Sequence, residues 1–164
     1  MVGERSEKDE EKSFLDRALK MLAIRDHSRR ELGDKLRAKG CGEEVAERIL
    51  QRLADWGYLD DKRYAAQFVK NKVRNGWGGR RVYGELLRHG VAVEIVEEVC
   101  QSLREESGDE LSRALELARR KASSGRDYAS IGRFLAARGF VPSVAAEAAR
   151  LALEEFSNPE KCGE

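Results

Sequence analysis

An internal repeat of about 50 residues is the feature that most constrains how this chain can fold. The repeat is anchored on three glycines, Gly40, Gly90 and Gly139, which lie 50 and 49 residues apart. Four residues before them lie Leu36, Leu86 and Leu135, eight before them Leu32, Val82 and Ile131, five after them Val45, Ile95 and Val144, and thirteen after them Leu53, Leu103 and Ala152. Apolar sets in register at this period predict three copies of one supersecondary unit. The last set is the weakest, because Ala152 is small.

Each copy has room for three helices joined by short turns. In the first copy, apolar residues follow helical spacing over about 13–25, 28–40 and 43–57. Gly40 has the place of a left-handed C-terminal cap. Two capping boxes mark the starts of the first two helices, Ser13 with Asp16 and Ser28 with Glu31.

Turn residues continue this plan in the later copies. Gly76 and Gly90 are expected to stop helices of the second copy. In the third copy, Gly125 ends a helix, Asp127 can cap the next, and Pro142 suits the first turn of the last one. Leu, Ala, Glu and Arg dominate the composition and there are only two prolines, which is typical of helical proteins.

We therefore predict an all-α fold of three tandem three-helix, helix-turn-helix-like repeats in an elongated, curved array. The charged fraction of 37% fits a chain with much surface per residue, or one from a hot environment. The predicted limits are a flexible N-terminus at 1–12, repeats at 13–59, 60–107 and 108–156, and a C-terminal tail at 157–164.

Charge follows the same period, although the whole chain has a net charge of only +1. Residues 14–42, 62–90 and 111–139 carry +4, +7 and +5, and the segments after them, 43–61, 91–110 and 140–164, carry −4, −6 and −3. If the copies stack in similar orientation, the basic segments form a strip that suits a polyanion. The alternative is that opposite charges simply pair along the chain.

The basic segments supply the candidate binding residues. The central ones are Lys70, Lys72, Arg74, Arg80, Arg81 and Arg88, and the outer repeats add Arg25, Arg29, Arg30, Arg119, Arg120, Lys121 and Arg126. Such cations suit phosphates or an acidic protein surface, or else form a solvated face and, for Lys72 and Arg74, stabilise the end of their own helix. Trp77, between glycines, is expected to pack rather than to stack on a ligand. Trp56 and Tyr58 are expected to pack the joint between copies, and Tyr64 and Phe68 to lie in the core.

Signatures of enzymes and metal sites are missing from the sequence. The segment GWGGRR lacks the GK[ST] ending of a Walker A loop, and no GxSxG motif is present. Asp60 and Asp61 fit helix capping better than catalysis. His27 and His89 have no partner at ligand spacing, and His89 is expected to interact with a helix end. We predict no catalytic residue, no metal and no cofactor.

Cellular location is also constrained. Three widely spaced cysteines without a CxxC suggest reduced thiols. The charged N-terminus does not fit a signal peptide, and no apolar run reaches the length of a membrane span. The expectation is a soluble cytoplasmic protein with no membrane contact.

Two stretches resemble a known family. The segment LKMLAIRDHSRRELGDKLRAKG is similar to the opening motif of the RecX family, and YLDDKRYA, followed by FV, GWG, RV, EL and HGV, resembles its central signature. The match extends from about Phe14 to Phe156 and is specific in the first two repeats. Gly79 and Val82 are mild departures, because many members carry Pro or another residue at the first position and Ile at the second.

The resemblance implies both a fold and a function. RecX-family proteins are built of tandem three-helix repeats, lie along the groove of the RecA nucleoprotein filament and modulate RecA, usually by inhibition, in recombination, DNA repair and the SOS response. The candidate cations would then contact RecA or DNA, the latter weakly and with salt dependence. The alternative function is a helical-repeat scaffold that binds nucleic acid independently of RecA.

Overall fold

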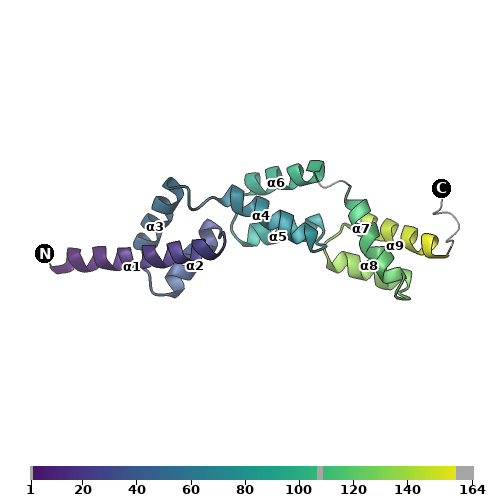
Figure 1. The fold of residues 1–164 in the computed structure, drawn as a ribbon, viewed down its shortest axis with the longest axis horizontal. Coiled ribbons are helices and arrows are strands. Elements are labelled where there is room, and N and C mark those ends of the chain that lie inside the picture. Colours follow the sequence, from purple (N-terminus) through teal and green to yellow (C-terminus); the bar gives the residue numbers. More distant parts are fainter. Residues whose placement is uncertain (1, 107–108, 158–164) are drawn as a thin grey trace. The chain divides into compact units, whose positions relative to one another are not determined.

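The computed structural model describes residues 2–106 and 109–157, with side chains described for 7–102 and 109–157. Over these residues it contains helices and no strand, as predicted (Figure 1). The helices are α1 (Val2–Ile24), α2 (Arg29–Ala38), α3 (Glu43–Asp55), α4 (Asp61–Arg74), α5 (Gly79–Arg88), α6 (Val93–Glu106), α7 (Glu110–Ala122), α8 (Tyr128–Ala137) and α9 (Pro142–Ser157). They follow one another as three sets of three, which confirms the fold of three-helix repeats.

The three anchor glycines end the middle helix of each repeat. Gly40, Gly90 and Gly139 have φ angles of 92°, 76° and 92°, a left-handed conformation that L side chains rarely adopt. In each case the next residue donates its N–H to the carbonyl four residues before the glycine, as from Cys41 to Leu36 O at 3.1 Å. This is a Schellman cap, and it fixes where the chain turns toward the third helix.

Burial confirms the repeat register, with one adjustment. The positions four and eight residues before each glycine, such as Leu36 and Leu32, are 0% exposed in all three copies. Val45 and its equivalents are only half-buried, whereas the next residue, Ala46, is buried, so the inward position lies six residues after the glycine. Ala152 is 1% exposed and occupies its core position despite its size. The side chain of Leu103 lies outside the described set.

The start of the first helix differs from the sequence prediction. A helix was expected to begin at Ser13, but α1 begins at Val2, so Ser13 lies inside the helix and does not cap it. Residues 2–12, predicted to be flexible, belong to this helix. Glu11 accepts hydrogen bonds from Arg48 at 3.2 Å and Arg52 at 3.0 Å, two residues of α3. The first helix is therefore held by side chains that lie about 40 residues away.

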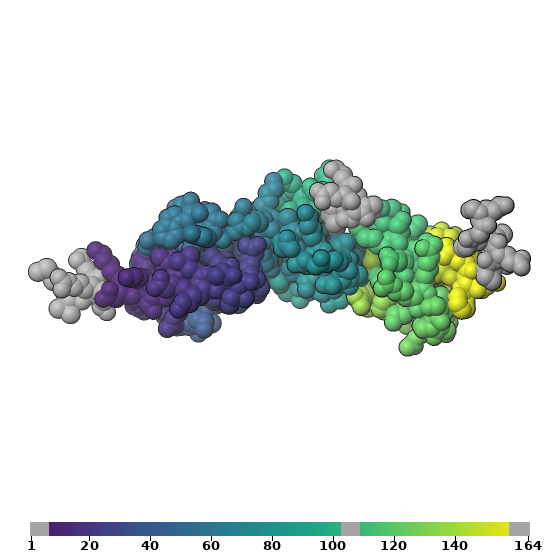
Figure 2. Space-filling view, in the orientation of Figure 1, coloured from purple at the N-terminus to yellow at the C-terminus, as the bar shows by residue number. Residues whose placement is uncertain are grey.

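The chain divides into two compact units. The first contains residues up to 66 and residues 86–95, and the second contains residues 67–85 and residues from 96 onward. In the first unit, α1, α2 and α3 pack around a core of large aliphatic side chains. In the second, α7, α8 and α9 enclose a core of Ile131, Leu135, Phe140 and seven alanines, and Figure 2 shows this repeat in green to yellow. Alanines let neighbouring helices pack closely.

The limits of the predicted repeats are only partly described. The predicted boundary at 107 and 108 and the tail after residue 157 lie outside the described residues. The other turn predictions hold: Asp127 caps α8 by accepting the Ser130 N–H at 2.9 Å, and α9 begins at Pro142. Asp60 caps α4 by accepting the N–H groups of Lys62 and Arg63.

Candidate functional site

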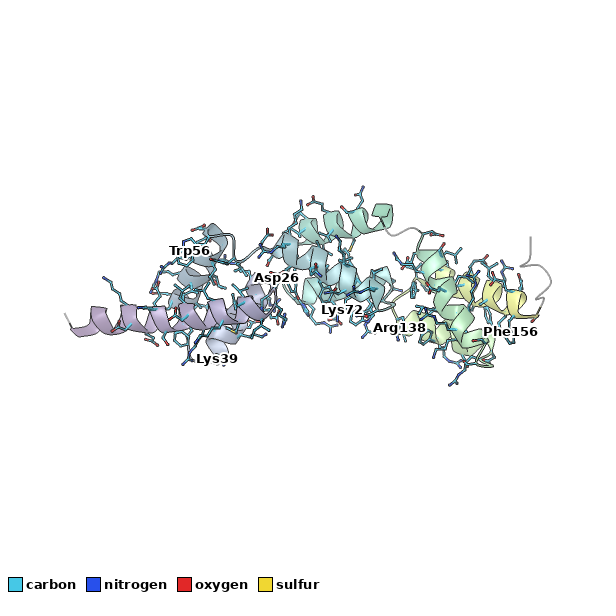
Figure 3. The ribbon with its side chains drawn as sticks, viewed as in Figure 1. Asp26, Lys39, Trp56, Lys72, Arg138 and Phe156 are labelled. Carbon is cyan, nitrogen blue, oxygen red and sulfur yellow. The ribbon has the colours of Figure 1, made fainter. Side chains whose placement is uncertain are left out.

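Two cations of the central repeat lie against the ring of Trp77. Its half-buried ring meets Phe68 edge to face, with centroids 6.5 Å apart. The Lys72 ammonium lies 4.5 Å and the Arg81 guanidinium 3.8 Å from the centroid of the indole. Such cation–π contacts stabilise by about 0.5–1 kcal/mol at exposed sites. The structure confirms that Trp77 packs, and it brings together two of the predicted cations (Figure 3, where Lys72 is labelled).

The other central cations are exposed. Lys70 and Arg80 form no ion pair or side-chain hydrogen bond within the described residues. Arg74 donates a hydrogen bond only to the neutral Asn71 Oδ1, at 3.3 Å. Arg88 is exposed in the last turn of α5. Of these side chains, Lys70, Arg74 and Arg80 are available to a polyanion, because no acid neutralises them within the part of the chain that is described.

The candidate cations of the first repeat are paired with acids. Arg25 forms an ion pair with Glu31, Arg29 lies 2.9 Å from Glu47, and Arg30 lies 3.9 Å from Asp34. Burial alone would raise the pKa of Glu31, but hydrogen bonds from Arg25 and Lys35 outweigh it and lower this pKa to about 2. Here the alternative from the sequence, pairing of opposite charges, describes the structure better than a free basic surface.

The candidate cations of the third repeat include both side chains that are paired with acids and side chains that are not. Arg119 binds Glu155 at 2.7 Å, and Arg120 binds Glu116 at 2.7 Å. Lys121 lies 4.6 Å from the centroid of the Phe134 ring, and Arg126 is exposed beside it. The thirteen predicted cations therefore divide by environment, and those without an acid partner lie mainly in the central repeat.

The joint between the first and second repeats is built at the start of α2. Ser28 is fully buried, accepts the Glu31 N–H at 3.1 Å and donates its hydroxyl to the His89 carbonyl at 2.6 Å. The Arg29 N–H donates to Asp61 Oδ1 at 2.7 Å. The predicted N-cap is therefore also a contact with the next repeat, and we call this set the first joint.

His89 and Tyr64 complete the first joint. The Tyr64 hydroxyl lies 2.5 Å from Nδ1 of His89, so His89 has a specific side-chain partner and not only the helix-end interaction that the sequence suggested. Tyr64 is 5% exposed, as predicted for a core residue, whereas Phe68 is half-buried. Burial comes first among the causes that raise the pKa of Tyr64 to about 12. The phenol is therefore neutral at physiological pH.

The joint between the second and third repeats has the same plan. At the start of α5, the Gly78 N–H donates to the Arg138 carbonyl at 2.8 Å, and the Arg80 N–H donates to the Gly139 carbonyl at 3.1 Å. The Gly79 N–H donates to Glu110 Oε1 at 2.9 Å. Here the start of α5 meets the end of α8 and the start of α7, and we call this set the second joint.

Both joints use the same positions of the repeat. Ser28 and Gly78 each lie twelve residues before their own anchor glycine, and the carbonyls that they bind belong to the residue just before the next anchor glycine. The acids Asp61 and Glu110 each lie 29 residues before theirs. From the sequence, Ser28 and Asp61 were predicted only as helix-capping residues. Their equivalence to Gly78 and Glu110 follows from the repeat period, but contact between repeats was not predicted for any of the four.

A buried histidine stands beside the first joint. His27 is 4% exposed, its Nδ1 lies 3.0 Å from the Arg25 carbonyl, and its Nε2 lies 2.9 Å from the Lys35 ammonium. A carbonyl only accepts and an ammonium only donates, so Nδ1 carries the proton of a neutral ring. Burial lowers the pKa of His27. Among the described residues, no group of three or more His, Cys, Asp or Glu is placed to hold a metal ion.

Trp56 and Tyr58 do not pack as predicted. Their side chains are 50% and 54% exposed and meet edge to face, and the Arg52 guanidinium lies 5.0 Å from the centroid of Trp56 (Figure 3). Leu59, at 6% exposure, is the buried residue of this turn.

None of the described helices is both long and apolar enough to cross a membrane.

Comparisons with known proteins agree with the repeat architecture. Residues 15–53 match the family model of the first three-helix domain of RecX, and residues 60–99 match that of the second. The regulatory protein RecX of Thermus thermophilus is 44% identical over 138 residues, which is 84% of this chain and 91% of that protein. The regulatory protein RecX of Acidithiobacillus ferrooxidans is 38% identical over 75% of this chain and 79% of its own length.

Solved structures show the same fold. The crystal structure of RecX from Lactobacillus salivarius superposes with a TM-score of 0.75, covering 90% of this chain and 98% of that one at 21% sequence identity. A second crystal structure of regulatory protein RecX gives the same TM-score at 20% identity. At these identities the likeness concerns the fold alone. Together with the domain matches and the relatives at up to 44% identity, the three-helix repeats place this chain in the RecX family of regulatory proteins.

Proposed function

We propose that this protein binds the RecA recombinase and its nucleoprotein filament and lowers RecA activity in recombination, DNA repair and the SOS response. The observation that carries the proposal is its membership of a family of regulatory proteins, with relatives up to 44% identical over most of the chain.

The central repeat supplies the contact surface in this proposal. Lys70 and Arg80 have no acid partner within the described residues. Both belong to the same compact unit as Trp77 and the two cations that lie against its ring. Exposed cations exchange their counterions for phosphates or acidic side chains, and this exchange makes binding weaken with salt. Arg25, Arg29 and Arg30 contribute less, because a contact there must compete with Glu31, Glu47 and Asp34.

The direct test is a titration of purified protein into the DNA-dependent ATPase and strand-exchange reactions of the cognate RecA. Both activities are expected to fall at amounts comparable to RecA or below it. The double variant Lys70→Ala with Arg80→Ala is expected to need several-fold more protein for the same inhibition. The slope of log affinity against log salt should fall by about 0.7–0.9 for each phosphate that the variant no longer neutralises.

The matched control is Arg48→Ala with Arg150→Ala, which removes the same charge from two positions outside the candidate set. Arg48 is paired with Glu11, and Arg150 with Glu147 and Glu154, so inhibition by this variant should equal that of the wild type. Unchanged RecA activity across a wide titration would contradict the proposal. Tight, salt-sensitive DNA binding without any effect on RecA would instead favour the scaffold that acts independently of RecA.

A further inference from the structure

Arg113 stands where the other two repeats place an aromatic ring. Phe14, Tyr64 and Arg113 each lie 26 residues before their anchor glycine. Phe14 is 8% and Tyr64 5% exposed, and the ring of Tyr64 is part of the first joint. In the third repeat a thin, charged side chain takes this inward position. The guanidinium nitrogens Nε and Nη1 of Arg113 are buried and have no hydrogen-bond partner among the residues that the structure describes.

A cavity of about 700 Å³ lies at the second joint, and Arg113 is one of the residues that line it. Its volume falls within the range of small-molecule sites, roughly 300–1,000 Å³. One part of the wall is apolar, with Val82, Tyr83, Cys100, Val141 and Val144, and the other part is polar, with Gly79, Arg80, Asp109, Glu110 and Arg113. All of these residues belong to the second compact unit.

The buried nitrogens of Arg113 favour an acceptor that carries negative charge. A guanidinium has five N–H donors and no acceptor, and leaving it buried without a partner is costly. Glu110, which lines the same cavity, uses its Oε1 to accept the Gly79 N–H instead of pairing with Arg113. Two helices, α5 and α7, also begin at this wall and direct the positive ends of their dipoles toward it.

We propose that this cavity is a binding site for a small organic carboxylate with an apolar body. The carboxylate accepts hydrogen bonds from the buried Arg113 nitrogens, and the apolar body lies against Tyr83, Val141 and Val144. A single negative charge suits the site better than a phosphate, because Asp109 and Glu110 also line the wall. The proposal goes beyond the regulation of RecA and concerns a ligand that no part of that function requires.

Methyl-resolved NMR tests the site with three probes: 4-phenylbutyrate, the neutral 4-phenyl-1-butanol, and acetate. The methyl signals of Val141 and Val144 report the cavity wall. We expect saturable shifts with 4-phenylbutyrate, at least tenfold weaker binding of the alcohol, and no saturation with acetate. Equal binding of the alcohol, or no saturable shift with the carboxylate, overturns the proposal.

The variant Arg113→Met removes the charge and keeps an unbranched side chain of similar length. Its thermal midpoint should equal or exceed that of the wild type, because two buried nitrogens without hydrogen-bond partners are removed, and its affinity for 4-phenylbutyrate should fall at least tenfold. The control Arg133→Met changes an exposed arginine of α8 outside the cavity and should bind as the wild type does. Wild-type affinity in Arg113→Met rejects the site. Neither RecA nor DNA is present, so the outcome is independent of the regulatory proposal.

Discussion

The two joints between successive repeats share one geometry but differ in chemistry. In each, the start of a middle helix meets the end of the next middle helix, and an acid at the start of the following repeat, Asp61 or Glu110, accepts a backbone N–H. The first joint places the hydroxyl of Ser28 against the carbonyl of His89, whereas the second uses the backbone N–H of Gly78. The period therefore fixes which positions meet, and the side chains decide how closely they approach.

The joints differ in how closely the two segments approach at the residue before the middle helix. A Cβ atom built on Gly78 would lie 2.3 Å from the backbone carbon of Gly139 and 2.3 Å from the nitrogen of Phe140. The equivalent position of the first joint carries Ser28, with a Cβ and a hydroxyl. At this position the second joint therefore depends on the absence of a side chain, and the first depends on the presence of one.

The variant Gly78→Ala should have the largest effect, because the added methyl meets backbone atoms that cannot move independently. We expect the second unit to lose about 3 kcal/mol or more of unfolding free energy. Urea denaturation in a Trp56→Phe background measures this, since Trp77 is then the only tryptophan and lies in the second unit.

The control for this variant is Gly84→Ala, inside helix α5, which begins one residue after Gly78. Nothing lies within 4 Å of a Cβ built on Gly84, and this glycine is exposed. An alanine there should stabilise the helix by about 0.5–1 kcal/mol. If Gly78→Ala were as stable as Gly84→Ala, the close approach in the second joint would be refuted.

The first joint should respond to Ser28→Ala with a smaller loss. The variant removes the N-cap of α2 and leaves the part-buried His89 carbonyl without the hydroxyl donor. Together these changes should cost about 2 kcal/mol of unfolding free energy. Urea denaturation followed by Trp56 fluorescence, in a Trp77→Phe background, reports the unit in which this joint lies.

Ser13→Ala is the matched control for this loss. Ser13 is exposed in the interior of α1, so alanine should leave the unfolding free energy within about 0.5 kcal/mol of the wild type. If both serines were helix caps, as the two capping boxes predict, the two variants would lose similar amounts. Equal losses would therefore remove the distinction between the two helix starts.

The sequence predicted the fold where local spacing determines it. Leu32 and Leu36 recur at helical spacing, and only the inward face of a helix buries residues so placed, so the core register could be found without coordinates. The start of α1 could not be found in this way, because residues 2–12 have no apolar pattern. The interactions of this segment are tertiary, since Glu11 forms ion pairs with Arg48 and Arg52 of α3. A contact between distant segments leaves no local signal.

The candidate site was predicted less completely for the same reason. Counting charges located the basic segments, but Arg29 pairs with Glu47 and Arg119 with Glu155, 18 and 36 residues away. Only folding shows which cations such partners neutralise. Trp77 was predicted to pack, and it does, whereas the exposure of Trp56 depends on tertiary neighbours that spacing does not specify.

The smallest expected effect is a pH dependence that arises from His27, which lies beside the first joint. His27 lies thirteen residues before its anchor glycine, and the equivalent position in the second repeat is Trp77, which does not titrate. Burial lowers the pKa of the folded His27, and the Arg25 and Lys35 charges act in the same direction, while the Arg25 carbonyl and Glu31 oppose them. The folded ring is therefore neutral, with Nε2 accepting from Lys35.

The sign of the pH effect follows from this lowered pKa. The unfolded chain takes up a proton at His27 near pH 6.5, whereas the folded chain does so only at lower pH. The unfolding free energy of the first unit should therefore be constant above about pH 7 and fall as the pH decreases through 6.5 toward the folded pKa. Denaturation of the Trp77→Phe background between about pH 7.5 and 5.5 measures the fall, which should be flatter in the same background with His27→Gln. A decline of equal size in that variant would exclude His27 as its source, and the two joints would then differ in packing but not in their response to protons.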